Sequence, residues 1–217
     1  MLKFNHYDVI IFDCDGVILD SNNLKISAMR VALENAAYPK AEIDVAVEYF
    51  AANFGKSRFY HIAHFVDHIL TGIQDREAAY NALLCDYSTA CKQLYVQAEM
   101  TENFNLILEQ VSADKHVASG SEQEELRQVF IERGMASHFG HILGSPVAKV
   151  DNVARIIASY QDKKILMVGD AKSDFDAAQE NGIDFAFYLP YSNVQQQMLG
   201  NAGVYGFPVI HSFKEVL

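Results

Sequence analysis

The chain has 217 residues, 50% of them hydrophobic and 21% charged, which is typical of a globular protein long enough to bury a full core. Its formal net charge of −11 makes it a poor nucleic-acid binder, because neutralisation of phosphates supplies most of that affinity. Three cysteines without a spaced framework argue against a disulfide scaffold, and no apolar run approaches membrane-spanning length. The first residues also lack a signal-peptide apolar region, so we expect a cytoplasmic protein.

The first predicted element is a short strand at residues 9–12, whose unbroken apolar run is typical of a strand buried on both faces of a parallel sheet. Asp13 and Asp15 follow directly, and Gly16 lets the chain turn away. Two carboxylates at the end of a buried strand are costly unless a cation or a reaction uses them. Ligands of open α/β sheets bind at that end, so the sequence predicts a functional site there.

The next stretch, residues 20–95, shows helical spacing and nothing that alternates like a strand. The predicted helices cover a segment from Ser21 to about residue 38 and then roughly 41–53, 57–70 and 75–97, the last with Asp75 as a plausible N-cap. We therefore expect an all-helical insertion of about four helices.

From Thr101 onward, predicted helices and strands alternate. The strands are expected at 116–119, 141–144, 165–168, 185–189 and 209–210. The helices are expected at 101–111, from Ser121 to about Gly134 with a Ser121–Glu124 capping box, at 148–160, from a Ser173 cap to about residue 182, and after Ser212. This alternation predicts an α/β core with a doubly wound parallel sheet, formed by residues 1–19 and 96–217, with residues 20–95 inserted.

Four short motifs resemble those of the haloacid dehalogenase superfamily, in the same order. Asp-Cys-Asp-Gly-Val resembles the first motif, DxDG[TV], and Gly-Asp-Ala-Lys-Ser-Asp resembles the fourth, GDxxxD. A serine at a strand end and a lysine at a helix start resemble the second and third motifs. The matching residues are Asp13, Asp15, Ser119, Lys149, Asp170 and Asp174. The resemblance covers nearly the whole chain and implies a Rossmann-like core with a helical cap after the first motif.

The resemblance also implies a mechanism. Asp13 would attack phosphorus and form an aspartyl-phosphate, while Asp15 would protonate the leaving oxygen and later deprotonate the attacking water. Ser119, the Gly120 backbone and Lys149 would hold the phosphoryl oxygens.

An oxygen-only ligand set with few members favours Mg²⁺. The resemblance implies that Asp13 and Asp170 bind the ion directly and that the Asp15 backbone carbonyl completes the set, with Asp174 acting through water or orienting its neighbours. We expect a Mg²⁺-dependent phosphatase of a small phosphorylated metabolite, similar to phosphoglycolate phosphatases and β-phosphoglucomutases.

Two features of the expected cap bear on the substrate. Gly55-Lys-Ser57-Arg58 resembles a β-phosphoglucomutase loop whose arginine can hold substrate, although a helix turn with Ser57 as N-cap is an equal alternative. Lys25 occupies the position of a β-phosphoglucomutase histidine that handles sugar-hydroxyl protons, and a lysine is too basic for that role near neutral pH. Lys25 is either a substrate ligand or part of a solvated helix face.

Several alternatives stay open at this point. A sugar phosphomutase, a phosphonatase with Lys25 or Lys56 as Schiff base and a non-catalytic binding module share the expected fold, whereas Asp15 argues against a dehalogenase. Three histidines share one side of a predicted cap helix at helical spacing, His61, His64 and His68. They form either a polar helix face or a Zn²⁺ site.

Overall fold

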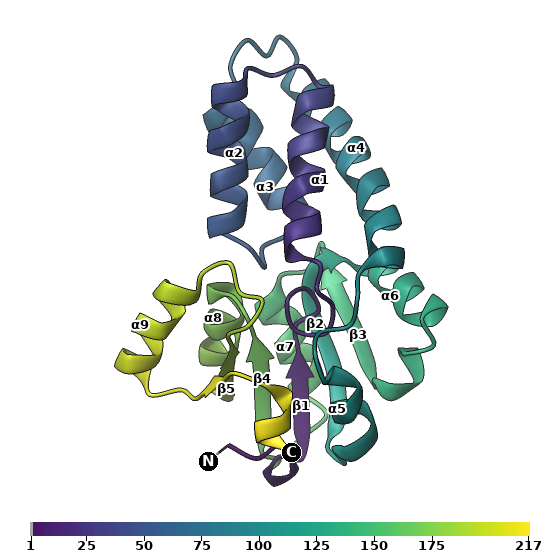
Figure 1. The fold of residues 1–217 in the computed structure, drawn as a ribbon, viewed down its shortest axis with the longest axis vertical. Coiled ribbons are helices and arrows are strands. Elements are labelled where there is room, and N and C mark those ends of the chain that lie inside the picture. The colour runs from purple at the N-terminus through teal and green to yellow at the C-terminus, as the bar shows by residue number, and fades with distance from the viewer. Residues whose placement is uncertain (1) are drawn as a thin grey trace.

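A six-stranded parallel sheet lies at the centre of the molecule, which a computed structural model describes for residues 2–217 (Figure 1). The strand order is β3-β2-β1-β4-β5-β6. The strands are Val9–Phe12 (β1), Asp114–Glu122 (β2), His141–Ser145 (β3), Ile165–Gly169 (β4), Asp184–Tyr188 (β5) and Val209–Ile210 (β6). Chain order runs outward from β1 in both directions, which confirms the doubly wound arrangement predicted from the sequence.

Strand β1 is buried on both of its faces because its side chains alternate between two hydrophobic clusters. Ile10 and Phe12 join one cluster, and Val9 and Ile11 join the other. The first cluster lies under α5 (Phe104–Gln110) and α6 (Gln123–Glu132). The second lies under α7 (Lys149–Ile157), α8 (Lys172–Glu180) and α9 (Gln195–Tyr205). The apolar run of β1 is therefore explained by helices on both faces of the sheet.

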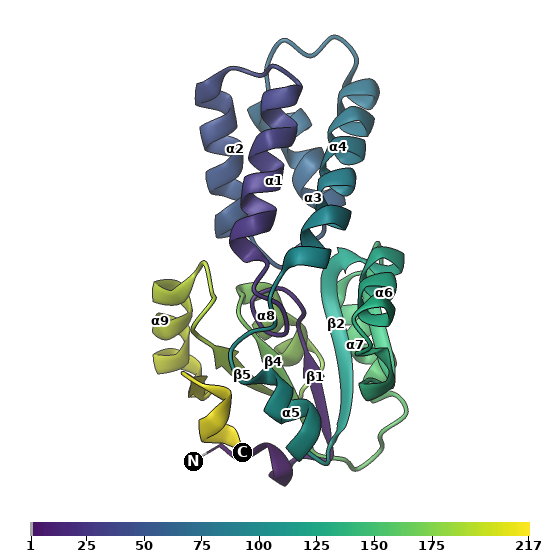
Figure 2. The same cartoon turned by 45° about the vertical axis from the view of Figure 1, so that its right-hand side comes forward.

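The helical insertion, here called the cap, stands over the carboxyl end of the sheet (Figures 1 and 2). It consists of α1 (Asn22–Asn35), α2 (Lys40–Ala52), α3 (Arg58–His64) with a π-helical turn at Phe65–Ile69, and α4 (Arg76–Gln97). The cap has a hydrophobic cluster of its own, which includes Leu33, Phe50 and Tyr87. The division into residues 20–95 and the remainder stays a prediction.

Helix termini confirm some sequence predictions and correct others. Asp75 caps α4 as expected, since its carboxylate accepts a hydrogen bond from the Ala78 amide at 3.0 Å. The Ser121 capping box is wrong, because β2 continues through Ser121 and the Glu122 carboxylate caps α6 instead. Ser173 does not cap α8 either, because that helix begins at Lys172 and the N-cap position is occupied by Ala171.

Helix α9 is absent from the sequence-based expectation. Two glycines at 200 and 203 lower its intrinsic helix propensity, and Met198 is its buried anchor. The short terminal helix after Ser212 is confirmed as a 3-10 turn at Phe213–Val216, and two further 3-10 turns lie at Phe4–His6 and Ala136–His138. Within residues 2–217, no helix combines the length and the apolar character that a membrane span requires.

Candidate active site

The predicted site residues converge because of the strand register. Phe12 of β1 lies opposite Val117 of β2 on one side and Val168 of β4 on the other. Residues that follow these positions on neighbouring parallel strands therefore meet at one edge of the sheet. Asp13, Ser119 and Asp170 all lie there, buried beneath the cap.

Three aspartates form a buried group that fits a hard cation. Asp13, Asp170 and Asp174 each place a carboxylate oxygen within 4.8 Å of the others, and each is at most 1% exposed. Asp170 Oδ2 accepts a hydrogen bond from Asn22 Nδ2 at 2.7 Å, whereas its buried Oδ1 has no hydrogen-bond partner. Because an unpaired buried carboxylate oxygen is costly, this atom is a natural ligand for a divalent ion.

Two glycines make room for this group of carboxylates. A Cβ atom at Gly16 would lie 2.3 Å from Asp170 Oδ2, and the φ of Gly16 is +76°. A Cβ atom at Gly169 would lie 2.2 Å from the Asp174 Cβ. Glycine is thus required at both positions for the close approach of the chain to the carboxylates.

Lys149 supplies the positive charge of this group. Its Nζ lies 3.0 Å from Asp13 Oδ1 and is also ion-paired with Asp174 Oδ1. Burial raises the pKa of Asp13 to about 7, aided by the charges of Asp174 and Asp15 and opposed by Lys149. Burial and the charges of Asp13 and Asp174 also raise the pKa of Asp170 well above its ordinary value. One ammonium therefore leaves three buried carboxylates with a negative excess that a divalent cation would neutralise.

Asp15 belongs to a separate hydrogen-bond network. Its carboxylate accepts bonds from Lys25 Nζ at 2.6 Å, Ser21 Oγ at 2.5 Å, Ser121 Oγ at 2.7 Å and Tyr95 OH at 3.1 Å. Burial by itself would raise the pKa of Asp15, but the Lys25 charge and the bonds from Lys25, Ser21 and Ser121 outweigh it and lower the pKa. Asp15 is thus held as a carboxylate.

The partners of Asp15 include residues that the sequence patterns did not identify. Ser121 was expected to cap a helix, yet its hydroxyl lies in the site. Tyr95 lies near the end of a long helix, where a tyrosine carries no local signal of function. Ser21 and Asn22 stand where the first motif leads into α1, so their closeness to the motif is the one signal that could have indicated them.

Ser119 and Gly120 lie where the cap meets the core. Ser119 is buried, and its hydroxyl accepts a hydrogen bond from the Ser121 amide at 3.1 Å. A Cβ atom at Gly120 would lie only 2.4 Å from the carbonyl oxygen of Gly55 in the cap loop. This contact brings the cap down onto the core, and the predicted phosphate-binding role of both residues stays a prediction.

Arg58 joins the cap to the core. Its guanidinium forms a bidentate pair with Glu125 of α6, with Nη1–Oε1 at 3.0 Å and Nη2–Oε2 at 2.6 Å, and also donates to Ser88 Oγ at 2.7 Å. Arg58 is 4% exposed and lies over the Tyr87 ring. The pair holds the cap closed in this structure, and substrate binding by Arg58 stays a prediction.

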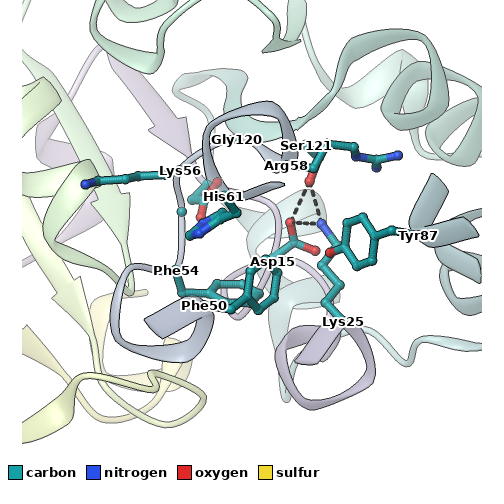
Figure 3. A pocket seen from close by; sticks show the side chains of 12 residues that line it. Asp15, Lys25, Phe50, Phe54, Lys56, Arg58, His61, Tyr87, Gly120 and Ser121 are labelled. Carbon is teal, nitrogen blue, oxygen red and sulfur yellow. Dashed lines mark hydrogen bonds and ion pairs between the residues drawn. The ribbon is translucent and has the colours of Figure 1, made fainter. Parts of the chain in front are cut away.

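A small cavity of about 20 Å³ remains between the closed cap and the core (Figure 3). Such a volume accommodates about one water molecule. The core side of its wall includes Asp13, Asp15 and Gly120, and the cap side includes Lys25, Arg58 and His61. In Figure 3, Asp15, Lys25 and Ser121 are joined in a triangle of hydrogen bonds, while Lys56 points away from them.

The three predicted cap histidines do not form a metal site. His61 is buried, whereas the His64 ring stacks on Tyr49 with centroids 3.9 Å apart. Across residues 2–217, the aspartate group described above is the one set of three or more His, Cys, Asp or Glu side chains close enough to share an ion.

Comparison with known proteins places this geometry in context. The sequence profile described as "Haloacid dehalogenase-like hydrolase" matches residues 10–188. The tyrosine-protein kinase PtkA of Mycobacterium tuberculosis is 25% identical over 183 residues, which cover 81% of this chain and 60% of that protein. The chain thus spans about 60% of the length of that curated relative.

Solved structures share the fold at low sequence identity. A predicted phosphatase from Clostridium acetobutylicum has a TM-score of 0.76 at 18% identity, covering 96% of this chain and 95% of the other. A predicted phosphoglycolate phosphatase from Haemophilus somnus has a TM-score of 0.69 at 16% identity, covering 84% and 85%.

Proposed function

The chain belongs to the haloacid dehalogenase-like hydrolase family, and on this basis we propose that it is a Mg²⁺-dependent phosphatase that hydrolyses a small phosphorylated metabolite through an aspartyl-phosphate. The observation that carries this proposal is the buried group of Asp13, Asp170 and Asp174, with Lys149 at its side. Such a group combines a nucleophile with the carboxylates that a hard cation requires.

In the first step, Asp13 attacks phosphorus, and the bond between phosphorus and the leaving oxygen breaks as Asp15 protonates that oxygen. In the second step, water attacks the aspartyl-phosphate, Asp15 accepts its proton, and phosphate and the Asp13 carboxylate are released. Lys149, Ser119 and the Gly120 amide hold the phosphoryl oxygens in both steps. Mg²⁺, held by Asp13 and Asp170, would supply charge neutralisation at the phosphoryl group.

The network around Asp15 affects its two roles differently. Held as a carboxylate by Lys25 and its other partners, Asp15 is ready to accept the proton of the attacking water. To protonate a leaving oxygen it must first gain a proton and give up the contact with Lys25, because an ammonium favours the charged form of its partner. The closed structure therefore supports the second step best.

A second candidate comes from the curated relative named as a tyrosine-protein kinase. The same aspartyl-phosphate could pass its phosphoryl group to a tyrosine hydroxyl instead of to water. The cavity of about 20 Å³ beside Asp13 and Asp15 holds a water molecule as acceptor, whereas a tyrosine acceptor, like the substrate itself, would require the cap to open.

The mutase and phosphonatase alternatives gain less support. Lys25 is an ion-paired ammonium bound to Asp15 and Ser121, and an ammonium has no free electron pair for a Schiff base. Lys56 Nζ bonds to Tyr60 OH, away from the cavity. A mutase would have to return the phosphoryl group to a sugar inside this closed space.

Phosphate release from a panel of small phosphate esters, with Mg²⁺ and with chelator, tests the proposal. We expect Mg²⁺-dependent release by the wild type and none by Asp13→Asn, which removes the nucleophile while leaving a similar shape. Circular dichroism should show that the variant is folded. Full activity of Asp13→Asn would refute the mechanism, and transfer from ATP to a tyrosine peptide without phosphate release would favour the kinase candidate.

A further inference from the structure

His61 is a buried side chain without a partner in the wall of the candidate active site. It lies on α3, it is 1% exposed, and it lines the same cavity as Asp13 and Asp15. Neither of its ring nitrogens has a hydrogen-bond partner of normal geometry, although the ring lies near the backbone of Asn53. Figure 3 shows the ring beside Phe54, with no interaction drawn to it. Burial of two unpaired polar atoms costs stability, which is reasonable where a ligand is to pair with them.

The other polar side chains that the cap contributes to this wall are already paired. Lys25 bonds to Asp15 and Ser121, and Arg58 bonds to Glu125. Lys56 also lines the cavity, but its Nζ is directed to Tyr60 OH, and the Tyr87 hydroxyl is bonded to Cys91. Among the described residues that line the cavity, His61 is therefore the cap side chain with hydrogen-bonding capacity to spare.

The surroundings of His61 keep its imidazole neutral. Its ring packs against the edge of Phe50 with centroids 4.6 Å apart and lies near the rings of Tyr49, Tyr60 and Phe65. Burial, together with the charges of Lys56 and His64, lowers the pKa of His61 to about 3. A neutral imidazole offers one N–H donor and one nitrogen acceptor, which matches the donor and the acceptor of a hydroxyl group.

A carboxylate fits this wall less well than a hydroxyl does. The ammonium of Lys25 and the guanidinium of Arg58 are each neutralised by a carboxylate of the protein. An anionic leaving group would bring a further negative charge beside these ion pairs. Lys56 is the lining cation without a carboxylate partner, and its Nζ is directed to Tyr60 OH, away from Asp15.

We propose that His61 determines substrate specificity by hydrogen-bonding a neutral hydroxyl group on the alcohol part of a small phosphate monoester. This inference rests on the proposed phosphatase function and adds the class of substrate. It distinguishes hydroxylated alcohol phosphates from phosphorylated carboxylates, including phosphoglycolate, and from plain alkyl phosphates.

Three two-carbon phosphate esters that differ only in their end group provide the test: 2-hydroxyethyl phosphate, ethyl phosphate and phosphoglycolate. We expect kcat/KM of the wild type for 2-hydroxyethyl phosphate to exceed that for each of the others at least about tenfold. In His61→Phe, which keeps a ring of similar shape, the advantage over ethyl phosphate should fall below about threefold. Circular dichroism should show that the variant is folded, and its own kcat/KM for ethyl phosphate is the reference for this ratio.

His61→Asn retains a donor and an acceptor and should restore part of the preference, mainly through KM. A merely structural role of His61 would instead lower the activity on all three esters alike. Preference for phosphoglycolate, or an unchanged preference in His61→Phe, would overturn the inference while leaving the phosphatase proposal intact.

Binding to Asp13→Asn separates this inference from the proposed function. Calorimetry with the three esters and Mg²⁺ measures discrimination without turnover. Tighter binding of 2-hydroxyethyl phosphate that is lost on adding His61→Phe would support the inference even if the wild type released no phosphate. Equal affinities for the three esters would overturn it even if the wild type were an active phosphatase.

Discussion

At the scale of single residues, the site is dominated by an excess of buried negative charge. Asp13, Asp170 and Asp174 share one ammonium, that of Lys149, and the pKa of Asp13 is raised to about 7. Their close approach is costly without a cation, since each carboxylate loses its hydration on burial. Stability of the folded chain should therefore be coupled to divalent metal.

Asp170→Asn tests this coupling through thermal unfolding. At a Mg²⁺ concentration of about 100 times its dissociation constant, we expect the wild type to gain about 2.7 kcal/mol, or a Tm rise of about 5–10 °C. The variant should lose most of this gain and, without metal, be at least as stable as the wild type because one buried charge is gone. Asp176→Asn, which removes the surface partner of Lys172 on the same helix, is the control. An equal Mg²⁺ effect in Asp170→Asn would contradict the assignment.

His61 predicts a dependence of stability on pH. Its folded pKa of about 3 lies below the ordinary 6.5, so between these values the unfolded chain binds a proton at this position and the folded chain does not. Stability should be fully present above pH 6.5 and should fall as the pH falls. At pH 5, the loss from this group is about 2 kcal/mol.

Urea unfolding at pH 7 and pH 5 measures this loss. His61→Phe should lack it, whereas the same change at the exposed His138 should leave the pH dependence of the wild type in place. If the free energy of unfolding changed equally between pH 7 and pH 5 in the wild type and in His61→Phe, His61 would not be buried in the neutral form.

The motif residues could be predicted because each stands at the end of a buried strand or the start of a helix, where local sequence determines position. Asp13 and Asp170 are examples. Ser121 and Tyr95 could not, because their contacts with Asp15 arise from the packing of α4 and from the length of β2. His61 was recognised as one of a row of histidines, but its lack of a partner depends on the tertiary structure.

At the scale of elements, the Arg58–Glu125 pair connects α3 of the cap with α6 of the core. Both side chains are less than 10% exposed, and the pair is bidentate. A buried pair of this kind is costly to break by removal of one partner, by about 3–5 kcal/mol, because the other charge is left without compensation. The closed arrangement of the cap therefore depends on this contact.

Glu125→Ala should shift the cap toward an open arrangement in which Arg58 reaches water. We expect faster proteolysis in the loop at residues 53–57 and a loss of at least about tenfold in kcat/KM, because closure excludes water and completes the site. Glu124→Ala is the matched control, since Glu124 lies on the same helix and pairs with Arg127 at the surface. Unchanged proteolysis and kinetics in Glu125→Ala would rule out this role of the pair.

The helices and strands also differ in how well the sequence predicts them. Strand β1 and helices α2, α4 and α7 have clear apolar runs or helical spacing and were predicted close to their bounds. Helix α9 was missed because it buries little and contains two glycines, so tertiary contacts decide its conformation.

At the scale of the whole molecule, the cap rests on the core through the contact of Gly120 with the Gly55 carbonyl. The backbone of Gly120 does not require a positive φ, so alanine is compatible with the core by itself. Its methyl group would nevertheless lie 2.4 Å from the Gly55 carbonyl oxygen. Because this oxygen belongs to the backbone, it cannot move aside as a flexible side chain would. Gly120→Ala should therefore prevent closure and leave the core folded.

We expect Gly120→Ala to lower kcat/KM about a hundredfold, because a displacement of about 1 Å in a closed site has effects of that size. Small-angle scattering should show a larger radius of gyration than that of the wild type. Gly200→Ala serves as the control, since a Cβ atom there meets nothing within 4 Å. Wild-type kinetics and scattering for Gly120→Ala would mean that the contact is not needed for catalysis.

The cavity of about 20 Å³ has a consequence for the fate of the phosphorylated enzyme. In the proposed mechanism, the leaving alcohol departs and the cap closes again before the acceptor reacts, so the space left beside Asp15 limits the size of that acceptor. A single water molecule fits, whereas a sugar, a glycerol or a protein side chain is held outside until the cap reopens. The partition between hydrolysis and transfer would then be governed by the relative rates of cap opening and water attack, and a slower cap would make a stricter hydrolase.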